Sequence, residues 1–86
     1  MVPRKRIPKE RDVQFWQALG NTLRELRDGK FNQDNFADVV GVYRSHMGLI
    51  EQGKLDVRLS TLLSLAAALD MPLSELMRKV EEREQP

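Results

Sequence analysis

The sequence predicts an all-α fold, and three observations indicate this fold class. Apolar residues recur at steps of three and four through most of the chain, which is the spacing that forms one apolar stripe on a helix. Glycines, asparagines and short polar segments separate these stretches, as is typical where helices end and begin. The one β-branched stretch, residues 39–43, is interrupted by Gly41 and lies between helical patterns. We therefore predict five helices packed as one compact domain.

Length and composition limit the class of protein to which this chain can belong. Its 86 residues suffice for one small domain, and the absence of cysteine excludes disulfides and thiolate metal sites. No apolar run approaches the roughly 20 residues of a membrane span, and no apolar signal region follows the charged N-terminus. These features predict a cytoplasmic protein without membrane association.

Charge is distributed unevenly along the chain, although the net charge is only +1. Residues 1–11 hold five basic side chains and one acidic side chain, whereas residues 12–74 hold six basic and eight acidic ones. Two prolines and the lack of a helical period predict that residues 1–11 form a basic flexible arm, whose candidate contact residues are Arg4, Lys5 and Arg6. The arm either contacts phosphates or the minor groove of DNA, or it is a solvated tail. Residues 12–80 are the predicted domain, and residues 81–86 are a charged C-terminal tail.

The first helix is predicted to begin after Asp12, a candidate cap, and to end near Asp28 and Gly29. Gly20 is a poor helix former within this stretch, and it indicates either the close approach of another helix or a small break. The apolar stripe of the helix consists of Trp16, Leu19, Leu23 and Leu26.

A pair of short helices joined by a tight turn is predicted for residues 33–53. Asn32 is the candidate cap of the first helix, and Gly41 permits the left-handed conformation that ends it. The second helix is predicted for about residues 44–52, with Gly53 as its stop. Helices this short must pack on a larger helical body, which leaves one face of the second helix exposed. This arrangement suits the insertion of a helix into the major groove of DNA.

Two further helices are predicted after this pair. Ser60 is the candidate cap of the fourth helix, which is apolar almost all round and is therefore expected to be the most buried. The loop before it is expected to tuck Leu55, Val57 and Leu59 against the core. The last helix, residues 73–83, is amphipathic, and its apolar face either forms a dimer surface or completes the core of the monomer. The dimer candidates on this face are Leu73, Leu76, Met77 and Val80.

Neither catalysis nor cofactor binding is predicted. His46 is the only histidine, and without cysteine it has no partners for a metal site, so we expect it to face DNA or solvent. No nucleophile is placed by a motif beside a base, no glycine-rich phosphate loop occurs, and no small-molecule ligand is evident. The chain is therefore expected not to be an enzyme.

The motifs taken together resemble the phage repressor and Cro-like helix-turn-helix family, also called the xenobiotic-response-element type. The resemblance covers about residues 19–77 and rests on the segments LGNTLRELR, NQDNFADVVGVYRSHMGLIEQGK and LSTLLSLAAALDMPLSELM. Residues 43–48 are most similar to the restriction–modification controller proteins of that family. The resemblance implies a five-helix lambda-repressor-like domain that binds a palindromic operator as a homodimer and regulates transcription. For a controller protein it also implies regulation of a neighbouring restriction–modification operon.

The resemblance also implies roles for individual residues. Base contacts are implied for the third helix and phosphate contacts for Gln33 and the segment from Lys54 to Arg58, although Gln33 can also be an ordinary solvated residue. Arg27 and Glu51 are implied to form a structural ion pair; the alternative is two unrelated surface charges. The candidates for DNA contact are Gln33, Tyr43, Arg44, Ser45, His46, Gly48, Leu49, Lys54 and Arg58.

Several positions depart from the family's pattern. The first loop is one residue shorter than usual, and Tyr43 stands where Ser or Thr typically caps the recognition helix. Gly48 and Leu49 offer few hydrogen bonds to bases, and Asp56 would repel phosphate. These departures favour a second hypothesis, a protein-interaction module such as an antitoxin that binds a partner protein, with DNA binding secondary.

Overall fold

The structure, a computed structural model, describes residues 9–84, and these contain five α-helices and no strand. A short 3-10 turn at Glu10–Asp12 leads into the helical body. The helices are α1 (Val13–Arg27), α2 (Gln33–Val40), α3 (Arg44–Glu51), α4 (Leu59–Ala68) and α5 (Leu73–Glu84). The all-α fold class predicted from the sequence is confirmed.

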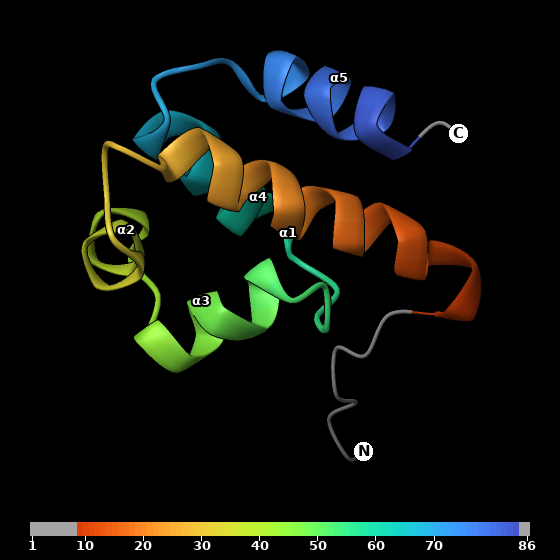
Figure 1. Ribbon diagram of the computed structural model, residues 1–86, viewed down its shortest axis with the longest axis horizontal. Helices are drawn as coiled ribbons and strands as arrows, with labels where there is room; N and C mark the ends of the chain where they lie inside the picture. Colours follow the sequence, from red (N-terminus) through yellow and green to blue (C-terminus); the bar gives the residue numbers. More distant parts are fainter. Residues whose placement is uncertain (1–8, 85–86) are drawn as a thin grey trace.

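Helix α1 is the centre of the arrangement. Figure 1 shows α5 running antiparallel along one side of α1, while α3 lies on the opposite side. Helix α2 packs against α3 and α4, and α4 also packs against α5. The core between the helices is apolar, and its largest fully buried side chains are Phe36, Leu19, Leu23, Met47, Ile50, Leu65, Leu76 and Val80. Because α3 has the helical body on one side only, it forms an edge of the molecule.

The ends of the helix pair are formed as the sequence predicts. The side chain of Asn32 accepts a hydrogen bond of 2.8 Å from the backbone N–H of Asn35 and so caps α2. Gly41 adopts a left-handed φ of 91° at the end of α2. Gly53, at φ 72°, ends α3 in a Schellman arrangement, in which the N–H of Lys54 donates to the carbonyl of Leu49.

Two glycines allow α1 and the end of α3 to come into backbone contact. A Cβ atom at Gly20 would lie 2.2 Å from the carbonyl oxygen of Glu51, and one at Gly53 would lie 2.7 Å from the Cα of Gln17. Helix α1 continues through Gly20 without a break. Of the two alternatives for Gly20, the structure therefore supports close approach, which sets the position of α3 on the body.

The structure corrects the predicted start and burial of α4. The helix begins at Leu59, with Arg58 as the extended N-cap residue, so Ser60 lies in its first turn and does not cap it. Leu59 and Leu63 are 63% and 51% exposed, whereas the helix was expected to be the most buried one. The buried side of α4 is formed instead by Leu62, Leu65, Ala66 and Leu69. The expectation that Leu59 tucks into the core is wrong, because the helix starts early enough to turn this residue outward.

Two further expectations concern α1 and α5. Asp12 holds the N-cap position of α1, but within residues 9–84 its side chain makes no capping hydrogen bond to that helix. Leu76 and Val80 have no exposed surface in the monomer, while Leu73 and Met77 are half-buried against the same core. Leu76 and Val80 therefore serve the core of the monomer and are not available for a dimer contact.

No single helix among residues 9–84 is long and apolar enough to cross a membrane. Helices α4 and α5 would meet the length and composition criteria only as a pair, and they are bent by 97° where they join.

Candidate nucleic-acid interface

Helix α3 has one buried side and one exposed side, and its sequence divides accordingly. Met47, Ile50 and Glu51 recur at steps of three and one and are at most 2% exposed. Most of the other side chains of α3 point outward, because residues three and four apart share a face of a helix. The exposed residues of α3 are Arg44, Ser45, His46 and Leu49, and Gly48 is half-buried.

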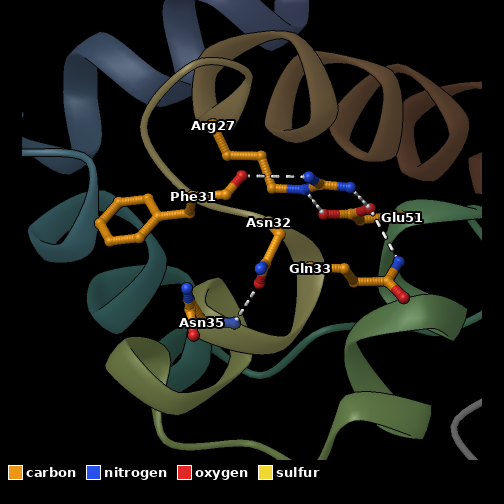
Figure 2. Close-up of polar contacts among 6 residues, drawn as sticks. All are labelled: Arg27, Phe31, Asn32, Gln33, Asn35 and Glu51. Atoms are coloured by element: carbon orange, nitrogen blue, oxygen red, sulfur yellow. Dashed lines mark hydrogen bonds and ion pairs between the residues drawn. The ribbon is translucent and has the colours of Figure 1, made fainter.

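The buried carboxylate of Glu51 ties α3 to two other helices. Its Oε2 accepts from Arg27 Nε at 2.6 Å, and its Oε1 accepts from Arg27 Nη2 and Gln33 Nε2, each at 3.0 Å. Arg27 also donates through Nη1 to the carbonyl of Phe31 at 3.3 Å, as Figure 2 shows. The ion pair of Arg27 and Glu51 implied by the resemblance is therefore present. Gln33 extends it to a network of three side chains through its hydrogen bond to Glu51. Three helix ends, those of α1, α2 and α3, meet at one carboxylate.

The electrostatics of this network favour the charged form of Arg27. Hydrogen bonding to the Glu51 carboxylate raises the pKa of the Arg27 guanidinium above its ordinary value, and burial opposes this only in part. The pKa remains far above neutral pH, so Arg27 stays charged under all ordinary conditions. Among the described residues, every buried side-chain nitrogen and oxygen has a hydrogen-bond partner. The network is thus a fully hydrogen-bonded support behind the exposed face of α3.

Gln33 lies at the border between this support and the exposed surface. It is half-buried, and one of the two N–H groups of its amide is used by Glu51. Its Oε1 would be 4.0 Å from a Cβ atom at Gly48, and the Nε2 of Gln52 would be equally near. A Cβ atom at Gly48 would therefore meet both glutamine amides only at ordinary contact distance.

The start of α3 lacks a side-chain cap, as expected from Tyr43. Tyr43 has an extended backbone at the N-cap position, and in the part of the chain that the structure describes no side chain accepts from the first turn of α3. Its ring is largely exposed. The first backbone N–H groups of α3 are therefore open to an external acceptor.

Arg44, at the first position of α3, forms an ion pair with Asp34 near the start of α2. Its Nε lies 2.7 Å from Asp34 Oδ1, and the two side chains are 72% and 58% exposed. The pair is thus located on the surface, beside the exposed face of α3.

The loop after α3 adds further polar residues at the same edge. Lys54 and Arg58 are exposed, and Arg58 precedes α4 directly. His46, Asp56 and Arg58 line an open surface hollow of about 230 Å³. Asp56 therefore shares this hollow with a basic residue and with the only histidine of the chain. Residues 9–84 hold no group of three or more potential metal ligands.

The candidate residues of the N-terminal arm, Arg4, Lys5 and Arg6, lie outside the described residues. The other candidates for DNA contact belong to α3, to the residues immediately before and after it, or to the start of α2 and the start of α4. The fold therefore brings together residues that are up to 25 positions apart in the sequence, Gln33 and Arg58 being the most distant.

Sequence reasoning missed two residues of this surface. Gln52 is exposed and lies beside Gly48, and it follows Ser45 by seven residues, which is two helical turns. This spacing could have identified it. Asp34 had no comparable signal, because its contact with Arg44 depends on how α2 and α3 are oriented across the turn.

Comparison with known proteins adds sequence and structural relatives, although no family model matches the chain. The chain is 37% identical over 66 residues to control protein C.MunI of a Mycoplasma species, and the match covers 74% of this chain and 89% of the relative. It is 30% identical over 64 residues to control protein C.SmaI of Serratia marcescens, covering 73% and 76% of the two chains.

Among solved structures, the restriction-modification controller protein C.AhdI from Aeromonas hydrophila is similar, with a TM-score of 0.67 and 39% sequence identity. The match covers 71% of this chain and 94% of that protein. The sequence likeness and the similar fold agree with the geometry of the exposed third helix. The chain belongs to the Cro-like helix-turn-helix family of DNA-binding transcription regulators, and within it to the control proteins.

Proposed function

We propose that this protein is a homodimeric regulator that binds a palindromic double-stranded DNA operator and places α3 in the major groove. The observation that carries this proposal is the two-sided character of α3. Its buried side is held by the network of Arg27, Glu51 and Gln33, while its opposite face is uncovered. An exposed helix at the edge of a small domain fits the major groove, which is about 12 Å wide.

The exposed face of α3 supplies the base contacts in this proposal. Arg44 pairs with the two acceptors of a guanine, because its guanidinium presents parallel donors. Ser45 contacts a base or a phosphate, and Leu49 packs on a thymine methyl group. Gln52 reaches the next base step, where its amide suits an adenine. Gly48 lets the helix approach the base edges closely.

Residues at the borders of α3 hold the DNA backbone. Gln33 donates its second amide hydrogen to a phosphate while it remains bonded to Glu51. Tyr43 flanks the phosphate at the open N-terminus of α3, and the arm with Arg4, Lys5 and Arg6 follows the adjacent backbone.

On the other side of α3, Lys54, Arg58 and His46 contact phosphates of the opposite strand. Phosphate contacts of this kind fix the register of a protein on the duplex.

The dimer surface in this proposal lies on α4. Leu59 and Leu63 are exposed one turn apart, and exposed Ala67 continues the same side. On α5, by contrast, Leu76 and Val80 are buried in the core of the monomer. A second copy of the chain covers the α4 leucines in a two-fold arrangement, in which the same patch is used by both subunits.

The biological role follows from the similarity to the control proteins. The relative C.AhdI is a restriction-modification controller protein. We infer the same role here: control of transcription of restriction–modification genes, including the gene of this protein.

The test is selection of bound sequences from a random duplex library at near-physiological salt. Enrichment of a palindrome with half-sites about one helical turn apart supports the dimer on an operator. Arg44→Ala should then cost about 1–3 kcal/mol on the best site and flatten the preference there. Arg78→Ala, on the exposed side of α5, is the matched control and should bind normally. If no sequence is enriched and a stoichiometric protein partner is recovered, the chain is an interaction module instead.

A further inference from the structure

The ion pair between Arg44 and Asp34 lies beside the exposed face of α3. Arg44 is the first residue of the exposed helix, and Asp34 is an acid beside the start of α2, at the edge where phosphates are proposed to bind. An unpaired carboxylate at this edge would repel DNA. Its charge is tolerable because Arg44 neutralises it.

The atoms in contact determine which side of the guanidinium stays available. The closest approach is between Arg44 Nε and Asp34 Oδ1, at 2.7 Å. Within residues 9–84 the two terminal nitrogens of Arg44 make no hydrogen bond, so the end of the fork remains open. The end of the fork has two parallel N–H donors, which match O6 and N7 of guanine. The ion pair at Nε therefore leaves both terminal nitrogens of Arg44 available for a base.

The same contact disfavours other uses of Arg44. If the guanidinium turned to a phosphate, as in non-specific binding, the carboxylate of Asp34 would be left unpaired next to the negatively charged backbone. The carboxylate of Asp34 thus makes the free energy of non-specific phosphate binding by Arg44 less favourable. A repulsive element of this kind increases specificity.

We propose that Asp34 is a positioning residue that determines specificity: it orients Arg44 toward guanine and opposes its use as a phosphate contact. The proposal rests on the function proposed above. It assigns to the acid a role in discrimination, both between bases and between the operator and random DNA.

The experiment compares Asp34→Asn with Asp38→Asn on the operator recovered by selection. Asp38 is an exposed acid one turn further along α2, and it takes part in no ion pair of the described residues, so its variant removes the same charge from the same helix. Binding is measured to the operator, to the operator with the guanine opposite Arg44 replaced by adenine, and to a random duplex. Both single variants are also made in the Arg44→Ala background.

The unmodified protein should prefer guanine by about tenfold or more, which is the discrimination expected of a bidentate arginine. Asp34→Asn should lower this preference to below about threefold and tighten binding to the random duplex several-fold, whereas Asp38→Asn should keep the preference. In the Arg44→Ala background, Asp34→Asn should no longer change discrimination.

Three results would overturn the proposal. If Asp34→Asn discriminates as well as Asp38→Asn, the acid is an ordinary surface charge. If it lowers discrimination equally without Arg44, it does not act through that residue. If the unmodified protein selects no sequence at all, the proposed function fails together with the role of Asp34, and this result is distinct from the first two.

Discussion

Removal of Arg27 is the sharpest test of how the exposed helix is supported. Arg27→Ala deletes two hydrogen bonds to Glu51 and leaves a carboxylate that is 2% exposed with only the amide of Gln33 as a donor. Breaking a buried ion pair by removing one partner costs about 3–5 kcal/mol. The side chain of Arg27 is 18% exposed, so water can reach the site. We therefore expect a cost of about 2–4 kcal/mol.

This cost is large for a domain of this size. Stability of about 0.05–0.15 kcal/mol per residue corresponds to roughly 4–13 kcal/mol in total. The midpoint of thermal unfolding should fall by roughly 8–32 °C, since about 1 kcal/mol corresponds to 4–8 °C in domains of this length. Urea and thermal unfolding followed by circular dichroism measure both quantities.

The matched control is the exposed ion pair of α5. Arg78 and Glu82 are one turn apart and both exposed, so Arg78→Ala should cost only about 0.3–0.5 kcal/mol. A double-mutant cycle of Arg27→Ala with Glu51→Gln should return a coupling of about 2 kcal/mol, because the two side chains share their bonds. If Arg27→Ala were no more destabilising than Arg78→Ala, the idea that the buried network holds α3 in place would be refuted.

Three further predictions concern other parts of the molecule. Gly20→Ala should destabilise the protein by about 1–3 kcal/mol in urea unfolding, because the new Cβ would overlap the carbonyl oxygen of Glu51. Helix propensity alone predicts a gain in stability from this substitution. A net stabilisation would therefore contradict the close packing of the two helices. Leu63→Lys should shift sedimentation from dimer to monomer while helical content is retained, and an unchanged dimer would exclude the α4 surface. Deletion of residues 1–8 should lower the salt dependence of DNA binding by about 0.9 for each phosphate that the arm neutralises; an unchanged slope would assign the arm to solubility alone.

Local features were predictable because they depend on residues close together in the chain. The cap of α2 needs only the side chain of Asn32 and an N–H three residues later, and the stops at Gly41 and Gly53 need only backbone freedom at one position. The helical period of α1 and α5 likewise follows from apolar spacing. The Arg27–Glu51 pair was not visible in local patterns, and it was expected only because the chain resembles a known family.

The remaining features depend on which faces meet in three dimensions. The apolar spacing predicts that α4 and α5 each have an apolar face, but it does not predict which apolar residues other helices cover. Leu76 is buried, whereas Leu63 is exposed to solvent. The partner of Arg44 is likewise undetermined by sequence, since Asp34 and Asp38 are equivalent acids on α2 until the turn fixes how α2 and α3 cross. The sequence by itself determined the five helices, the ends of α2, the stop of α3 and the exposed helix-turn-helix unit. The tertiary structure alone decided the free apolar surface and the charge that orients Arg44, because burial and ion pairing are set by neighbours distant in the chain.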